Sequence, residues 1–224
     1  MTKASVHPRF GVVNLDWAKG GDAELLHHVA LKCTAFGAVE GRTFSGRPVN
    51  IRNILMDSDW LSNQDTSDGA RSGSSINWKP DAPGFTIYPR STSARRARVW
   101  RRVKQKPRYV SFNAGRLGGK RCRYICFHES PKRNQHAVNV ARVAKSVIGA
   151  RMRGASWIVF CDGNMSLRAM MRRLGAKNGV SADVMMMIGS RDIVFEDIEK
   201  DKFGKVNELT NHNILFATVR RRKP

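Results

Sequence analysis

The chain has 224 residues, 41% of them hydrophobic and 26% charged, which is enough apolar material for the core of a single globular domain. Its 40 Lys and Arg against 18 Asp and Glu give a formal charge of +22, an excess that favours binding to polyanions, above all nucleic acid. No apolar run approaches the roughly 18 residues of a membrane-spanning helix, and the N-terminus lacks an apolar secretion core. We therefore expect an intracellular protein that is cytoplasmic or nucleoid-associated. Its expected partner is nucleic acid, and we expect no association with a membrane.

The first quarter of the chain predicts two short strands around one helix. Residues 11–15 form a buried strand, and an amphipathic helix runs from about Asp22 to Cys33 with Gly37 as its stop. Residues 38–40 form the second strand. This order is typical of a strand–helix–strand unit.

The second quarter predicts a loop followed by a hairpin. Residues 62–75 are rich in Ser, Asp, Gly and Asn, which indicates a long surface loop. Residues 75–78 and 85–88 alternate between apolar and polar side chains, as hairpin strands do.

A basic arm is predicted at about 91–108, and a basic C-terminal tail at 220–224. The arm is either a solvated hairpin tip or helix face, or a segment that follows a phosphate backbone with an aromatic ring available for stacking. Its candidate nucleic-acid-binding residues are Arg95, Arg96, Arg98, Trp100, Arg101, Arg102, Lys104, Lys106 and Arg108.

The second half of the chain alternates strand pairs with helices. A helix follows Ser130-Pro131 to about Met152, with Ala137, Ala141, Ala144 and Ile148 on one face. A short helix at 167–174 is stopped by Gly175. The expected strands are 109–112, 122–128, 157–161, 183–188 and 214–219. The whole order predicts an α+β fold in which two mixed sheets pack together and helices flank them.

The four cysteines show no CxxC pairing of the kind that marks zinc or redox sites. Buried, reduced thiols are the expected state of Cys33, Cys122, Cys126 and Cys161.

The most informative junction is the point where the apolar run 157–161 stops at Asp162-Gly163-Asn164. Asp-Gly is a common hairpin turn, and Asp and Asn favour turns because their side chains bond to nearby backbone. The other interpretation is functional, since a carboxylate and an amide two residues apart at a sheet edge can hold a water, a metal or a phosphate.

Other predicted strands also end or begin at polar side chains, which in chain order are Asn14 and Asp16, Glu40, His128, Asp162 and Asn164, Asp183, and Asn211-His212. This ordered set resembles the motifs of the endonuclease/exonuclease/phosphatase superfamily. The first-strand Asn with an acid two residues on is similar to Val13-Asn14-Leu15-Asp16, and the "QE" strand resembles Ala38-Val39-Glu40. The "NxHL" strand resembles Cys126-Phe127-His128-Glu129.

The second half of the chain continues this resemblance. The "GDFN" strand end resembles Cys161-Asp162-Gly163-Asn164, and the "DYI" strand resembles Ala182-Asp183-Val184-Met185. The closing "SDH" resembles Thr210-Asn211-His212. Each motif is short, so their order and spacing over nearly the whole chain carry the resemblance, which implies a four-layer α/β sandwich like that of DNase I.

The resemblance also implies a reaction and a set of roles. It implies a metal-dependent nuclease, with Glu40, Asp16 and Asn211 at a Mg²⁺ or Mn²⁺ ion and Asp162 positioning or deprotonating the attacking water. Asn14 and Asn164 would donate to phosphate oxygens, and His128 would contact the phosphate or assist the leaving oxygen. His212, oriented by Asp183, would act as base or as phosphate-stabilising acid.

The chain departs from the family pattern at Asn211, where the closing motif has an acid. An amide there removes a negative charge that would help to hold a divalent cation. Two hypotheses follow: a nuclease that cleaves nucleic acid, expected to be DNA, or a catalytically impaired protein of the same fold that binds DNA.

Overall fold

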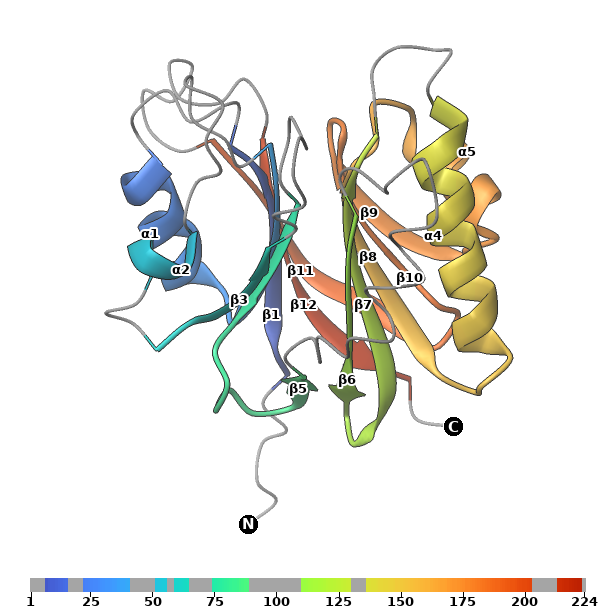
Figure 1. The fold of residues 1–224 in the computed structure, drawn as a ribbon, viewed down its shortest axis with the longest axis horizontal. Helices are drawn as coiled ribbons and strands as arrows, with labels where there is room; N and C mark the ends of the chain where they lie inside the picture. The colour runs from blue at the N-terminus through green and yellow to red at the C-terminus, as the bar shows by residue number, and fades with distance from the viewer. Residues whose placement is uncertain are drawn as a thin grey trace, which may run out of the picture.

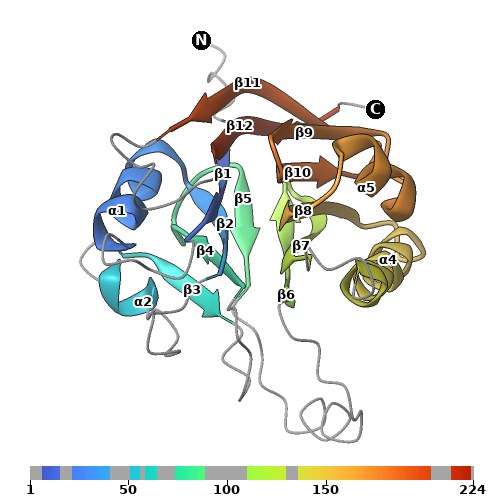
Figure 2. The ribbon, with the colours of Figure 1, turned by 90° about the horizontal axis from the view of Figure 1, so that it is seen from above.

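The computed structural model describes residues 7–15, 22–40, 51–55, 59–64, 74–88, 110–129, 136–202 and 213–222. Two six-stranded sheets face each other, and helices cover their outer faces, which gives four layers (Figures 1 and 2). The first sheet consists, in spatial order, of β11 (Ile193–Asp201), β12 (Ile214–Arg221), β1 (Arg9–Asn14), β2 (Ala35–Val39), β4 (Ser75–Trp78) and β3 (Leu61–Gln64). The second consists of β5 (Phe85–Ile87), β6 (Val110–Leu117), β7 (Lys120–His128), β8 (Ser156–Asp162), β10 (Met185–Gly189) and β9 (Asn178–Ala182).

The helices pack against the outer faces of the sheets. Helices α1 (Asp22–Lys32) and α2 (Ile51–Ile54) cover the first sheet, and α4 (His136–Arg151) and α5 (Leu167–Leu174) cover the second (Figure 2). None of the described helices is both long enough and apolar enough to cross a membrane. The predicted class of two packed mixed sheets flanked by helices is confirmed.

The main core lies between the sheets, where strands alternate apolar side chains inward. Phe10 of β1 makes edge contacts with the rings of Phe85, Tyr124 and Phe160, at centroid distances of 5.2, 6.0 and 5.9 Å. All four cysteines are free thiols and buried as predicted, and burial raises the pKa of each. They are therefore core residues rather than nucleophiles.

Two predicted features of the first half are wrong because non-local pairing overrides local pattern. Helix α1 ends at Lys32, and Gly37 lies inside β2, where an added Cβ would come within 2.5 Å of Phe160 Cβ. Gly37 therefore permits close approach of the two sheets. The strands β4 and β5 do not form a hairpin: β4 pairs with β2 and β3, while β5 pairs with β6 in the other sheet.

Several boundaries and faces also differ from the prediction. The predicted loop at 62–75 contains part of β3, and strands β9 and β11 were not predicted. The buried stripe of α4 consists of Val140, Val143, Val147 and Ala150, whereas the predicted Ile148 is 53% exposed. Arg220 and Arg221 belong to β12 rather than to a tail. By contrast, α5 has its predicted bounds, and Gly175 ends it with a left-handed φ of 61°.

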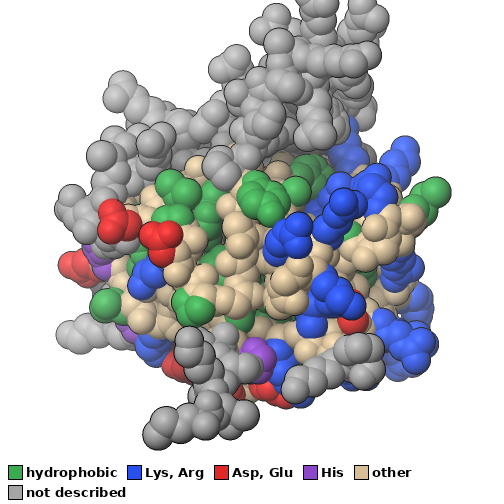
Figure 3. Space-filling view, turned by 90° about the horizontal axis from the view of Figure 1, so that it is seen from below, with side chains coloured by type: hydrophobic (Ala, Val, Ile, Leu, Met, Phe, Trp, Pro, Cys, Tyr) green, Lys and Arg blue, Asp and Glu red, His purple; other side chains and the backbone are tan. Residues whose placement is uncertain are grey.

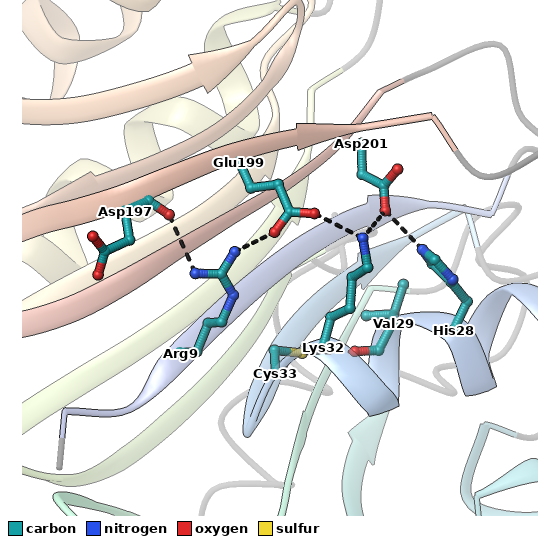
Figure 4. A network of polar contacts seen from close by, with 8 residues as sticks. All are labelled: Arg9, His28, Val29, Lys32, Cys33, Asp197, Glu199 and Asp201. Carbon is teal, nitrogen blue, oxygen red and sulfur yellow. Dashed lines mark hydrogen bonds and ion pairs between the residues drawn. The ribbon is translucent and has the colours of Figure 1, made fainter.

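Strand β11 is held to the rest of the first sheet by a network of charged side chains (Figure 4). Arg9 of β1 donates to Glu199, and Lys32 of α1 donates to both Glu199 and Asp201, at 2.7 and 2.6 Å. His28 Nε2 lies 2.7 Å from the same Asp201 carboxylate. Burial opposes ionisation of Asp201, but hydrogen bonds from Lys32 and His28 outweigh it and lower its pKa, while Asp201 and Glu199 raise the pKa of Lys32.

Asp201→Asn is expected to lower stability by about 1 kcal/mol at pH 7 and by nothing in acid. A carboxylate with a lowered pKa stabilises the fold above its unfolded pKa of about 3.9, and this contribution disappears as the pH falls through the folded value. Lys32, with its raised pKa, stays charged until the pH rises above about 10.4. Thermal unfolding of both proteins from pH 7 to pH 3 measures the effect, and an equal difference in Tm at both ends would contradict it.

Candidate active site

The polar ends of the strands meet at one edge of the sandwich because each sheet contains one parallel pair. Strands β1 and β2 run parallel in the first sheet, and β7 and β8 run parallel in the second. Asn14 ends β1 and Glu40 follows β2, while His128 and Asp162 end β7 and β8 and stand opposite each other in register. The carboxyl ends of both pairs therefore supply the candidate site, at the top edge in Figure 1.

Asp162 is the central residue of this site. Its side chain is buried, with 1% of the residue exposed, and both carboxylate oxygens accept hydrogen bonds. Asn14 Nδ2 donates to Oδ2 at 2.9 Å, and the backbone N–H of Asn164 donates to Oδ1 at 3.2 Å. The Asn14 bond crosses from the first sheet to the second, so it fixes the carboxylate relative to both.

The Asp162-Gly163-Asn164 junction is a turn and a polar site at once. The Asp162 side chain bonds to the backbone two residues on, as Asp does in turns, and Asn164 takes a left-handed φ of 44°. The turn leads into α5 through the N-cap Ser166, so it is not a hairpin. Asn164 Nδ2 donates to the carbonyl of Glu129 at 2.6 Å and lies 3.1 Å from His128 Nε2.

His128 Nε2 stands between two groups that make opposite demands. Asn164 Nδ2 offers it a hydrogen at 3.1 Å, and Glu40 Oε1 presents a carboxylate at 3.4 Å. An unprotonated Nε2 can accept from Asn164 but has no hydrogen for Glu40, while a protonated Nε2 can donate to Glu40 but cannot accept from the amide.

Glu40 carries a hard oxygen ligand of the type that divalent cations take. It follows β2 in a left-handed conformation with φ of 56°, which is uncommon for Glu, and its side chain is 14% exposed. Glu40, Asp162 and Asn14 carry carboxylate and amide oxygens, which are the type of ligand that Mg²⁺ prefers. Within the described ranges no three His, Cys, Asp or Glu side chains cluster as a metal site.

Asp183 lies beside the site, in the turn between β9 and β10. The backbone N–H of Gly163 donates to the carbonyl of Val184 at 2.9 Å, which ties this turn to the Asp162 junction. The Asp183 side chain is exposed, with a left-handed φ of 56°.

Glu129 was missed by the sequence interpretation. It is fully buried, its Oε2 accepts from the backbone N–H of Val140 at 3.2 Å, and its carbonyl accepts from Asn164. Asn139 Nδ2 donates to the carbonyl of His128 at 3.1 Å. Together these bonds attach α4 to the end of β7 and hold His128 and Asn164 in place. The sequence signal for this role is the position of an acidic residue, Glu129, directly after His128 at the end of a predicted strand.

The remaining predicted site residues lie outside the described ranges. These are Asp16, Asn211, His212 and the basic arm of Arg95, Arg96, Arg98, Trp100, Arg101, Arg102, Lys104, Lys106 and Arg108. Strand β12 begins at Ile214 and runs antiparallel to β1. Ile214 therefore lies at the same edge of the first sheet as Asn14, the last residue of β1.

No protein-family model and no curated protein matches this sequence. Solved structures do match its fold. An endonuclease/exonuclease/phosphatase from Bacteroides vulgatus aligns with a TM-score of 0.64 and 11% identity, over 97% of this chain and 100% of that chain. The 3′ phosphatase NExo from Neisseria, bound to a product DNA hairpin, aligns with a TM-score of 0.65 and 10% identity, over 94% and 98%. The endonuclease domain of TRAS1, a telomere-specific non-LTR retrotransposon, aligns with a TM-score of 0.61 and 15% identity, over 96% and 100%.

Proposed function

We propose that this chain, which has the endonuclease/exonuclease/phosphatase fold, is a divalent-metal-dependent phosphodiesterase that cleaves nucleic acid, with DNA as the expected substrate. The observation that carries the proposal is the meeting of Asn14, Glu40, His128, Asp162 and Asn164 at one edge. Phosphodiester hydrolysis needs an oriented water, donors for the phosphate oxygens and a ligand for a cation, and these five side chains can supply all three.

Each side chain has a role that its contacts support. Asp162 would orient the attacking water and take its proton, because Asn14 and Asn164 hold its carboxylate in a single direction. The hydrogen that Asn164 directs at His128 is the one it can offer to a phosphate oxygen. His128, when protonated, would donate to the phosphate or to the leaving oxygen.

Glu40, together with Asp16 and Asn211, would hold Mg²⁺ or Mn²⁺. Such an ion, when bound, neutralises the phosphate charge and lowers the pKa of a coordinated water. His212 would serve as base or phosphate-stabilising acid, with Asp183 as the carboxylate that orients it.

The overall charge supports nucleic acid as the substrate. A charge of +22 raises the local concentration of a polyanion, and the arm at 91–108 would follow its phosphate backbone. The Neisseria phosphatase of the same fold is bound to a DNA hairpin, which favours DNA.

The second candidate is a protein of this fold that binds DNA without cutting it, and Asn211 is the residue that favours it. An uncharged amide binds a divalent cation less tightly than a carboxylate does. The two candidates differ only in the chemical step.

Nicking of supercoiled plasmid in Mg²⁺ or Mn²⁺ tests the proposal, and Asn211→Asp sharpens it. We expect the wild type to nick, and Asn211→Asp to lower the half-saturating Mg²⁺ concentration about 10- to 100-fold, because it restores a carboxylate near the ion. A wild type that shifts plasmid in a gel but never nicks it, beside a variant that does, would favour the binding protein. No nicking by either protein would overturn the nuclease.

A further inference from the structure

The end of the sandwich opposite the candidate active site carries a basic hollow of about 870 Å³. Six cationic side chains line it: Lys120, Arg151, Lys177, Arg191, Arg221 and Arg222. Seen from below, Lys and Arg side chains gather on the side of the molecule that holds the second sheet (Figure 3).

The cations reach the hollow from different parts of the chain. Lys120 begins β7, Arg151 ends α4, and Lys177 follows α5. Arg191 lies in the turn between β10 and β11, and Arg221 ends β12. This convergence is therefore a product of the fold and is not visible as a basic run in the sequence.

Two of the six cations, Arg221 and Arg151, make contacts with neighbouring residues of the protein. Arg221 donates to Asp192 at 2.8 Å, and Asp192 also accepts from Ser156 and Ser190. Burial opposes ionisation of Asp192, but these hydrogen bonds outweigh it and lower its pKa. Arg151 donates to the carbonyl of Gly175 and lies over the Trp157 ring.

The other four cations, Lys120, Lys177, Arg191 and Arg222, are exposed. Among the described residues that line the hollow, Asp192 is the one carboxylate. The hollow therefore keeps a large positive charge that its own lining does not neutralise.

A smaller depression of about 240 Å³ adjoins the hollow and shares Ala155 with it. Arg116, Arg121 and Arg153 line it, with the half-exposed ring of Tyr88 beside them. The hollow and the depression thus meet at Ala155, both are basic, and an aromatic ring lines the depression, a combination that suits a sugar-phosphate backbone with bases beside it.

The hollow and the candidate active site are separate. Ser156, at the start of β8, lines the hollow, and Asp162 ends the same strand. At about 3.3 Å per residue, six steps along a strand separate them by roughly 20 Å. A ligand in the hollow leaves the active-site edge open.

We propose that this basic hollow is a second binding site for nucleic acid, which recognises the phosphate backbone without reading its sequence. Lys and Arg side chains on a concave surface neutralise successive phosphates. A lipid surface fits less well, because surface-bound proteins add apolar side chains that enter the bilayer, and no large apolar side chain is among the described residues of the lining. The site would hold a segment of nucleic acid distant from the one being cleaved.

Binding of a fluorescent 20-base-pair DNA duplex to the full chain, in EDTA and as a function of salt, tests this proposal. The double variant Lys177→Gln/Arg191→Gln should bind about tenfold more weakly at 150 mM salt and reduce the slope of log affinity against log salt by about two. In the wild type, DNA should slow hydrogen exchange at residues 175–178 and 190–193. Lys177→Arg/Arg191→Lys should keep the wild-type affinity, because it retains both charges.

The matched control is Lys145→Gln/Lys200→Gln, which removes two exposed cations away from the hollow. Equal weakening in both double variants would show a general charge effect and overturn the site, as would wild-type affinity in Lys177→Gln/Arg191→Gln. Loss of binding to vesicles of phosphatidylserine and phosphatidylcholine, with DNA binding unchanged, would assign the hollow to lipid headgroups and also overturn it. Because EDTA prevents metal-dependent cleavage, these results do not depend on nuclease activity.

Discussion

Asp162→Asn will lower plasmid nicking by roughly 10³-fold, within the range of 10²- to 10⁴-fold that removal of a general base costs. The substitution keeps the size of the side chain and removes the charge that orients and deprotonates water. It also replaces one accepting oxygen by a donor, although Asn14 and the backbone of Asn164 both donate to this carboxylate. One of these two bonds is lost, at a cost of about 1–3 kcal/mol in folding free energy.

Thermal unfolding and DNA binding in EDTA separate the two effects. We expect a folded variant with wild-type affinity for DNA and almost no nicking. Asp197→Asn is the matched control, because this exposed carboxylate lies on β11, away from the site. Undiminished nicking by Asp162→Asn would remove Asp162 from the chemistry, and equal loss in both variants would show that the effect is not local.

Glu40→Gln will abolish most of the response to Mg²⁺. We expect nicking at 1 mM Mg²⁺ to fall about 100-fold, since the neutral amide of Gln offers one uncharged oxygen in place of a carboxylate and holds the cation far less tightly. In the wild type, Mg²⁺ at a hundred times its Kd should stabilise the fold by about 2.7 kcal/mol, and this gain should vanish in the variant. Calorimetric unfolding with and without Mg²⁺ gives this measurement independently of cleavage.

The Glu40 variant also bears on His128, whose Nε2 faces the Glu40 carboxylate at 3.4 Å. The substitution removes the negative charge that faces Nε2 and leaves the contact with Asn164 Nδ2 at 3.1 Å in place. Glu24→Gln, on the exposed face of α1, is the control for charge loss alone. A wild-type Mg²⁺ response in Glu40→Gln would exclude Glu40 as the ligand.

Local pattern was sufficient where a strand ended at a polar group. The apolar run before Asp162 predicted β8. Helix α5 begins and ends at the predicted residues, between the N-cap Ser166 and Gly175. The meeting of Asn14 and Glu40 with Asp162 rested on the resemblance to a family, because sheet-to-sheet packing joins residues more than a hundred positions apart and leaves no local signal.

The failures have physical reasons of the same kind. Strand β11 carries four acids, so its sequence lacks the apolar alternation of a strand. Three of these acids, Glu196, Glu199 and Asp201, accept hydrogen bonds from the cations Arg220, Arg9 and Lys32, which no local pattern reveals. In α4, alanines and valines both recur at helical spacing, and Val140, Val143 and Val147 are buried with Ala150 in the cluster that includes Trp157. Periodicity alone does not separate the two stripes.

The hydrogen bond from Asn14 to Asp162 has a consequence for how this sequence can change. The bond joins opposite sheets, so its length depends on the spacing set by the core beneath it, where the backbone of Gly37 lies directly against Phe160. A methyl group gained at residue 37 would push the sheets apart and pull the carboxylate from its amide. Substitutions in the interior therefore affect the geometry of the Asn14–Asp162 pair as well as folding, and those that conserve hydrophobicity but not volume are expected to be rare along this line of contact.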